Sequence, residues 1–257
     1  MALLEVRCFS TALKMCVHFN IVLPQRQSTG EIGISSRGAQ KYPVLYLLHG
    51  LSDDDTIWLR RTSIERYATE QGIAVVMPTT HRAWYIDTPA GAYFTFVGTE
   101  LPQLVAEFCP TISADRADTY IAGLSMGGYG AMHIALAHPD RYAAAASLSG
   151  ALDIAAPART AQMMSEGVLA GDPTGTENDV YAQARALADT PQKPDLFFWC
   201  GTEDSLLADS RKMRDLTESL GFRVTYSESA GVHAWAYWDA QIQNVLAWIA
   251  DLRKEAR

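Results

Sequence analysis

Short apolar runs alternate with helix-patterned segments along most of this chain, and this alternation restricts its fold more than any other feature. The runs are continuously apolar, as in PVLYLLHG, IAVVMP and LFFWCG, which is typical of strands buried on both faces of a parallel sheet. The helical segments between them predict crossover connections. We therefore expect an α/β fold, with a mostly parallel central sheet of about eight strands and helices on both faces.

The expected elements follow this alternation along the chain. Strands are predicted at 43–50, 73–78, 119–124, 143–150, 196–201 and 222–229, and helices at 57–72, 94–108, 206–220 and 237–254, with a further helix after Ser125. Upstream, 1–9 and 15–23 are predicted to form an antiparallel hairpin, and 25–41 an exposed loop. The segment 151–194 is too long for an ordinary connection, so we predict one domain, 1–257, with a small cap insertion there.

Composition narrows the classes of partner. The chain has 257 residues, a formal net charge of −8 and no basic run, which argues against nucleic acid and anionic membranes as partners. No stretch reaches the roughly 18–20 apolar residues of a membrane-spanning helix. The first residues lack the basic, apolar and small-residue regions of a secretory signal, so we expect a cytoplasmic protein.

The four cysteines are scattered: Cys8, Cys16, Cys109 and Cys200 form no C-x-x-C pair. In a chain of this size without a secretory signal they are expected to be reduced thiols, mostly buried. Cys8 and Cys16 could face each other across the hairpin, but we do not expect a disulfide between them.

The stretch IAGLSMGGYGAMHIAL places Ser125 between glycines, after an apolar strand and before a helix-forming run. G-x-S-x-G alone occurs by chance in a chain of this length about one time in ten, but its strand and helix context is that of a nucleophile elbow. Gly123 and Gly127 would leave room for the strained turn, and Gly128 and Gly130 would let the helix pack closely. Ser125 would then lie at a helix N-terminus, which favours developing negative charge.

A serine nucleophile needs a base and an acid that orients it. Asp204 follows the strand in LFFWCGTEDSLL, and His233 follows the last strand in FRVTYSESAGVHAWAYW. Both lie where parallel sheets carry their chemistry, at the carboxyl ends of strands. The remaining acids and histidines are expected elsewhere, on turns, helices, the cap or the hairpin: Glu203, Asp209, Asp172, Asp239, His133, His138 and His18.

An oxyanion hole is expected beside this serine. The strand YLLHG ends at His49 and Gly50, where the backbone can turn its N–H groups inward. The amides of Leu51 and Met126 are our candidates, the second being the residue after the nucleophile. His49 is expected to be a structural hydrogen-bonding residue rather than a second base.

The substrate pocket is less constrained. Trp84 and Tyr85 lie in an aromatic-rich loop after a strand and either line the ester pocket or pack in the core. Trp235 either forms a pocket wall or packs, and the same alternatives hold for three residues of the cap: Met163, Met164 and Val168. The acidic run 53–55 lacks the spacing of a calcium loop, so we expect it to solvate the loop and to cap the helix that begins near Ile57, with no metal.

The sequence resembles the α/β-hydrolases, whose chain order of serine, acid and histidine it shares. More narrowly it resembles serine esterases of the esterase D-like branch, in particular the tributyrin esterase type of carboxylesterase. The resemblance covers nearly the whole chain and is carried by MALLEVRCFS, LLHGLSDDDTIWLRRTSIERYA, GLSMGGYGAM, WCGTEDSLL and GVHAWAYWDAQI. It implies a carboxylic-ester hydrolase that prefers small acyl groups and uses no cofactor.

The expected function is thus a serine carboxylesterase that acts on small-molecule, short-chain acyl esters through Ser125, His233 and Asp204. Relatives of this type act on feruloyl or acetyl esters of plant carbohydrate, and S-formylglutathione hydrolases share the scaffold, so both activities remain alternatives. An acyltransferase and a binding protein that has lost catalysis are the further rivals. Esterases of this type often assemble, which leaves room for a homo-oligomer.

Overall fold

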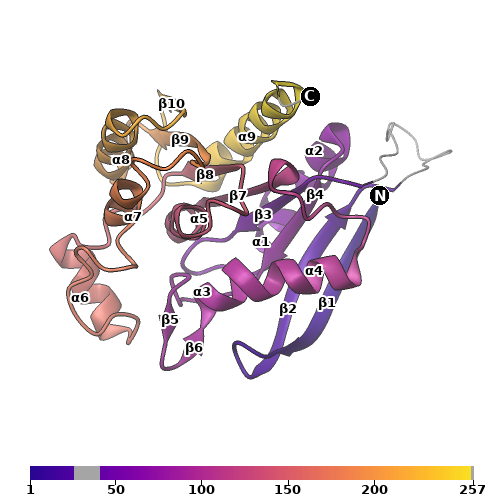
Figure 1. Cartoon of the computed structure of the whole chain (residues 1–257), viewed down its shortest axis with the longest axis horizontal. Helices are drawn as coiled ribbons and strands as arrows, with labels where there is room; N and C mark the ends of the chain where they lie inside the picture. The colour runs from indigo at the N-terminus through magenta and orange to yellow at the C-terminus, as the bar shows by residue number, and fades with distance from the viewer. Residues whose placement is uncertain (26–40, 256–257) are drawn as a thin grey trace.

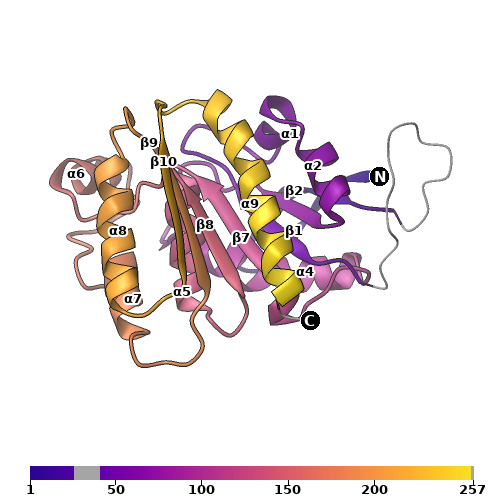
Figure 2. The same ribbon diagram turned by 90° about the horizontal axis from the view of Figure 1, so that it is seen from above.

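An eight-stranded sheet runs through the residues that the computed structural model describes, 1–25 and 41–255. Its strands stand in the order β1-β2-β4-β3-β7-β8-β9-β10 (Figures 1 and 2). Their bounds are β1 Ala2–Ser10, β2 Met15–Leu23, β3 Val44–Leu48, β4 Ala74–Pro78, β7 Thr119–Leu124, β8 Ala144–Leu148, β9 Asp195–Gly201 and β10 Val224–Ser229. A separate two-stranded ribbon joins β5 Asp87–Thr88 to β6 Gly91–Ala92.

The sheet is mostly parallel. Strands β4, β3, β7, β8, β9 and β10 pair in parallel, whereas β1 and β2 form an antiparallel hairpin and β2 also pairs antiparallel with β4. Every residue of β3, β4, β7 and β8 is buried, which is why these strands are continuously apolar rather than alternating. The predicted sheet and its N-terminal hairpin are therefore confirmed.

Helices cover both faces of the sheet, as predicted (Figure 2). One apolar core packs the sheet against α4 Leu101–Phe108, α5 Met126–Ala137, α7 Val180–Ala186 and α8 Leu207–Ser219. The other packs it against α1 Ile57–Arg61, α2 Ile64–Gln71 and α9 Trp235–Glu255. The remaining α-helices are α3 Tyr93–Thr95 and α6 Pro157–Ser165, and a short 3₁₀ helix spans Arg116–Asp118.

The prediction of one helix over 57–72 is wrong in one respect, because the segment forms two helices, α1 and α2. Thr62 between them has an extended backbone, with φ −137° and ψ 174°. Its hydroxyl donates to the Trp58 carbonyl at 2.6 Å and accepts from the Ile64 N–H at 3.1 Å. A threonine side chain that bonds its own backbone in this way competes with the helix ladder and ends it.

The helix predicted over 94–108 is present but contains a π-helical turn, Phe96–Glu100, between α3 and α4. Pro102 has no N–H to donate to the carbonyl four residues earlier, that of Gly98. The Arg141 guanidinium donates to that Gly98 carbonyl instead. The π turn thus lies where Pro102, near the start of α4, interrupts the regular hydrogen bonds of the helix.

Two further predictions concern the hairpin and the insertion. In the β1–β2 register Cys8 pairs with Val17 and Cys16 with Phe9, so the two cysteines point to opposite faces and both are free thiols. The predicted loop at 25–41 lies, except for its two ends, outside the described residues. The segment 151–194 holds α6 and α7, and its description as a cap on a single domain stays a prediction.

Candidate active site

Ser125 sits on a strained turn between β7 and α5. Its backbone has φ 54° and ψ −119°, a conformation that costs a non-glycine residue energy. Hydrogen bonds hold the turn: the Ser125 N–H donates to the Leu148 carbonyl at 3.0 Å, and the Ala151 N–H donates to the Ser125 carbonyl at 3.1 Å. The serine is therefore fixed by the neighbouring strand β8 and the loop that follows it.

The turn is possible only because its neighbours are glycines. A Cβ on Gly123 would lie 2.3 Å from the Gly127 carbonyl oxygen. A Cβ on Gly127 would lie 2.6 Å from the carbonyl oxygens of Leu48 and His49. Backbone atoms cannot yield at such distances, so the first turn of α5 packs on β7 and the end of β3 through glycine alone.

Three side chains form a hydrogen-bonded line at the carboxyl ends of the strands. His233 Nε2 lies 3.0 Å from Ser125 Oγ, and His233 Nδ1 lies 2.9 Å from Asp204 Oδ2. The Asp204 side chain is fully buried, whereas that of His233 is 36% exposed. Asp204 follows β9 and His233 follows β10, so two adjacent parallel strands bring the acid and the imidazole together. Residues far apart in sequence thus meet in the order that the sequence predicts.

The environment keeps Asp204 ionised. Burial alone would raise the pKa of this carboxyl, but hydrogen bonds from His233 and the Leu206 N–H outweigh it and hold the pKa below its ordinary value. The Leu206 N–H donates to Asp204 Oδ1 at 2.9 Å, which leaves Oδ2 for the imidazole. A buried carboxylate bonded in this way is fixed in orientation.

Glu203 fastens the loop that carries the imidazole. The Gly231 N–H donates to Glu203 Oε2 at 2.6 Å, while the Glu203 N–H donates to the Gly231 carbonyl at 3.0 Å. This hydrogen bond from Gly231 is also the main cause that lowers the pKa of the Glu203 carboxyl. We expected Glu203 to point differently from Asp204 on this turn, and its carboxylate binds the backbone of Gly231, two residues before His233. The sequence did not reveal this role, since adjacency to the acid was its only signal.

The other acids bond elsewhere. Asp209 pairs with Arg159 at 2.7 Å, Asp239 accepts from the Tyr67 hydroxyl at 3.0 Å, and Asp172 accepts from Thr174. Among the histidines, His133 is buried on α5 against Gln183, and His18 bonds Asp55. None of these contacts involves Ser125.

Two backbone N–H groups close to Ser125, one in sequence and one in space, have no internal acceptor among the described residues. Within the described part of the chain, neither the Leu51 nor the Met126 N–H donates to a backbone or side-chain atom. Leu51 follows Gly50, at which an added Cβ would lie 3.9 Å from Ser125 Cβ, and Met126 begins the twelve-residue helix α5. The arrangement could receive a negative oxygen, since both donors are available and the helix dipole adds positive potential.

His49 is bonded through both ring nitrogens. The Thr80 N–H donates to Nε2 at 3.0 Å, so Nδ1 carries the proton and donates to the Gly50 carbonyl at 2.7 Å. Burial lowers the pKa of His49 to about 4, which keeps the ring neutral. The ring therefore supports the Gly50 backbone structurally, in agreement with the sequence-based expectation.

Both rings of the aromatic loop, Trp84 and Tyr85, are buried. Tyr85 is fully buried against Gly130, and its hydroxyl donates to the His49 carbonyl at 3.0 Å. Trp84 is 3% exposed and lies edge-on to Tyr129. Core packing therefore accounts for both rings, and their suggested role in lining the ester pocket stays a prediction.

Trp235 and the three cap residues differ in how far their side chains are exposed. Trp235 is half-buried, edge-on to both Trp58 and Trp238. Met163 is fully buried and Val168 packs on the core, whereas Met164 is 46% exposed. Packing therefore accounts for Met163 and Val168, and a pocket role for Trp235 stays a prediction.

Trp238 and Ser149 were missed by the sequence reasoning. The Trp238 ring lies edge-on to the His233 imidazole, with centroids 4.8 Å apart, and its indole N–H donates to Ser149 Oγ at 3.3 Å. Ser149 follows β8 with φ 49° and is fully buried. The indole thus stabilises one side of the imidazole, and no motif in the sequence marks either residue.

Two residues of the acidic run after β3, Asp54 and Asp55, form hydrogen bonds that hold the surrounding loop and strands. Asp54 accepts from the Thr56 N–H and hydroxyl, just before α1. Asp55 is buried and bonded to three side chains, those of His18, Asn20 and Thr79. The residues described contain no group of three or more His, Cys, Asp or Glu side chains placed to hold a metal ion.

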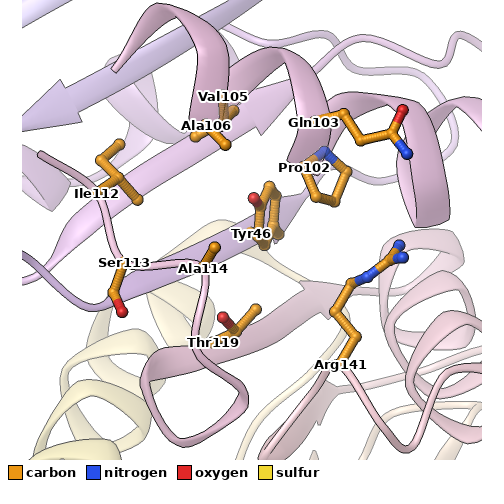
Figure 3. A pocket seen from close by; sticks show the side chains of 10 residues that line it. All are labelled: Tyr46, Pro102, Gln103, Val105, Ala106, Ile112, Ser113, Ala114, Thr119 and Arg141. Carbon is orange, nitrogen blue, oxygen red and sulfur yellow. The ribbon is translucent and has the colours of Figure 1, made fainter. Parts of the chain in front are cut away.

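A separate cavity of about 200 Å³ opens at the other end of β7 (Figure 3). It is lined by Tyr46, Pro102, Gln103, Val105, Ala106, Ile112, Ser113, Ala114, Thr119 and Arg141. Thr119 begins β7, whereas Ser125 follows the end of that strand. This cavity is therefore distinct from the line of Ser125, His233 and Asp204.

Known proteins match along almost the whole chain. The model of the Esterase family ("Putative esterase") matches residues 10–249. An acetyl esterase of Caldicellulosiruptor saccharolyticus is 27% identical over 264 residues, which cover 97% of this chain and 98% of that protein. The described residues form no helix long and apolar enough to cross a membrane.

Two solved structures from Staphylococcus aureus are similar. One is substrate-bound FphF, a fluorophosphonate-binding serine hydrolase, with 30% identity and a TM-score of 0.85. The other is the S-formylglutathione hydrolase FrmB without ligand, with 30% identity and a TM-score of 0.83. Each covers 97% of this chain and 98% of its own. Because the family model and both structures span nearly all of it, the chain belongs to the Esterase family and is a carboxylic-ester hydrolase with the α/β-hydrolase fold.

Proposed function

We propose that this enzyme is a serine carboxylesterase for short-chain acyl esters, with Ser125 as nucleophile, His233 as general base and acid, and Asp204 as the carboxylate that orients the imidazole. The observation that carries the proposal is the continuous line from Asp204 through His233 to Ser125, at 2.9 Å and 3.0 Å. These distances lie within the hydrogen-bonding reach that proton transfer requires.

The proposed reaction has two halves. Ser125 Oγ attacks the ester carbonyl carbon while its proton passes to His233 Nε2. The carbonyl oxygen becomes an oxyanion that accepts from the Leu51 and Met126 N–H groups. When the tetrahedral intermediate collapses, His233 gives its proton to the departing alcohol and an acyl-enzyme remains. Water then attacks the acyl carbon with His233 as base, and the acid is released as Ser125 regains its proton.

Asp204 acts by fixing the imidazole. Its Oδ2 accepts the proton on Nδ1, so Nε2 presents a lone pair to the serine. The lowered pKa of this carboxyl keeps it ionised while the neighbouring imidazole carries its transient positive charge. The preference for small acyl groups rests on the similarity to an acetyl esterase.

Hydrolysis of p-nitrophenyl esters from acetate to laurate tests this proposal, run beside methyl ferulate and S-formylglutathione. We expect the highest kcat/KM at acetate or butyrate, and a loss of several orders of magnitude in kcat in Ser125→Ala. The thioester is included because FrmB is 30% identical. A strong preference for it would replace the short-chain proposal with formylglutathione hydrolysis, and a preference for ferulate would indicate plant-carbohydrate esters. Activity that survives in Ser125→Ala would remove the nucleophile assignment.

A further inference from the structure

Strand β1 is a long, open edge of the sheet. It pairs with β2 on one side, and no other described strand pairs with it. Its nine residues include neither proline nor lysine, two residues that often protect an edge, and its only charged residues are Glu5 and Arg7, which have opposite signs. Two large apolar side chains lie exposed on one face, Leu3 at 45% and Phe9 at 61%. An edge of this length and composition is suited to pairing with another strand.

The exposed face of β1 is self-complementary. It carries Leu3, Glu5, Arg7 and Phe9 in alternation along the strand. If a second copy lay antiparallel with Val6 opposite its own Val6, Leu3 would face Phe9 of the second copy. Glu5 would then face Arg7 of the second copy, and the two-fold symmetry repeats both pairs. Opposite charges and apolar pairs directly across a strand pair stabilise it.

The two neighbouring registers on the same face do not pair opposite charges or match apolar side chains with each other. Centring the pair on Glu5 would put the two Glu5 carboxylates opposite each other and Leu3 opposite Arg7. Centring it on Arg7 would put two guanidinium groups together and Glu5 opposite Phe9. Both arrangements place like charges directly across the strands, which is destabilising. Of these three registers, only the one centred on Val6 places opposite charges across the strands.

The opposite face of β1 fits the same register. Leu4, Val6 and Cys8 pack against the core but remain only partly buried. In the register centred on Val6, Leu4 faces Cys8 of the second copy and the two Val6 side chains meet. A second copy would thus cover apolar surface on this face as well.

We propose that β1 pairs antiparallel with β1 of a second copy, Val6 opposite Val6, so that Glu5 and Arg7 form two ion pairs across the two-fold axis and the two sheets become one. The edge lies at the other end of the strand order from β9 and β10, which precede Asp204 and His233. The dimer leaves both active sites open, and hydrolysis per chain does not depend on it.

Sedimentation velocity at micromolar concentration tests the dimer with charge variants. The wild-type chain, of 28.2 kDa, should sediment as a dimer. Glu5→Arg and Arg7→Glu should each raise the dissociation constant by about tenfold or more, since each puts like charges across the strands twice. The double variant Glu5→Arg/Arg7→Glu restores opposite charges and should recover the wild-type constant. Glu65→Arg, the same charge change on the exposed face of α2, should have no effect.

Three results would overturn the proposal: a monomeric wild-type chain, a dimer indifferent to both single reversals, or a double variant that dissociates at least as readily as the singles. Circular dichroism on each variant separates dissociation from unfolding. Hydrolysis of p-nitrophenyl acetate is measured in parallel and should be equal in all variants. If the short-chain ester assay fails, the sedimentation test of the dimer is therefore unaffected. If the dimer is not found, the proposed esterase function is likewise unaffected.

Discussion

At the scale of single residues, the site is defined more by the fixed orientation of its three side chains than by shifts in their pKa values. Ser125 is strained by its backbone, His233 is held between two hydrogen bonds and the Trp238 ring, and Asp204 is buried with each oxygen bonded. Each group has little freedom to rotate before substrate arrives. Such preorganisation is a main source of catalytic rate in sites that carry developing charge.

Asp204→Asn should lower kcat by roughly 10⁴-fold without unfolding the protein. The amide can donate a hydrogen bond to Nδ1, which favours the tautomer whose Nε2 carries a proton and cannot accept one from Ser125. Steady-state kinetics on p-nitrophenyl acetate and a thermal melt measure both effects. Asp172→Asn, an exposed carboxylate in the 151–194 segment, is the control. Near-normal kcat in Asp204→Asn would show that another acid serves the imidazole.

At the scale of elements, the site is assembled by the packing of α5 on β3, β7 and β8. The glycines at the start of α5 let the helix approach the strands until backbone meets backbone. A side chain there would push the helix N-terminus, the Met126 N–H and Ser125 away from His233. The position of the serine is therefore a property of the packed elements as much as of the turn.

Gly123→Ala should both destabilise the enzyme and inactivate it. The added Cβ would meet the Gly127 carbonyl oxygen at 2.3 Å, and overpacking of this kind costs about 1–3 kcal/mol. That cost corresponds to a fall in Tm of about 2–10 °C for a domain of this size, measured by differential scanning calorimetry. Gly171→Ala, where the Cβ has nothing within 4 Å, should leave Tm and kcat unchanged. Equal behaviour of the two variants would refute the close packing of α5.

The inner strands β3, β4, β7 and β8 could be predicted from the sequence because burial on both faces makes them continuously apolar. Asp204 and His233 could be placed near Ser125 because all three follow strands of one parallel sheet. The break at Thr62 could not be predicted, since the apolar spacing of α1 continues into α2 while a single hydroxyl ends the helix. The burial of Tyr85 was equally hidden, because an aromatic loop has the same composition in a pocket and in a core. The catalytic roles themselves stay a prediction.

At the scale of the whole molecule, two buried histidines make stability depend on pH. Burial lowers the pKa of His49 and of His133 to about 4 in each case. Between about pH 6.5 and pH 4 the unfolded chain protonates these imidazoles and the folded chain does not. The contribution of these two neutral imidazoles to the free energy of unfolding is therefore fully present above pH 6.5. It is lost as the pH drops to 4, by on the order of 3 kcal/mol for each ring.

His133→Phe should make the free energy of unfolding depend less steeply on pH, because it removes one of the two imidazoles whose pKa burial lowers to about 4. The His133 ring stacks on Tyr129 and lies tilted against Phe94, so a phenyl group fits this aromatic surrounding and cannot be protonated. Urea unfolding at several pH values between 4 and 7 gives the slope for wild type and variant. His81→Asn, at an exposed position, should keep the wild-type slope. An unchanged slope in His133→Phe would mean that other groups cause the acid sensitivity.

The placement of the four thiols has a practical consequence for chemical labelling. Cys109 and Cys200 are buried, and burial beside the Asp204 charge raises the pKa of the Cys200 thiol to about 11. Burial also raises the pKa of Cys8, whereas Cys16 is exposed near the tip of the hairpin. A maleimide dye at neutral pH will therefore attach first to Cys16. The native enzyme thus carries its own site for a fluorophore, remote in the strand order from Ser125, Asp204 and His233, and needs no engineered cysteine for single-molecule work.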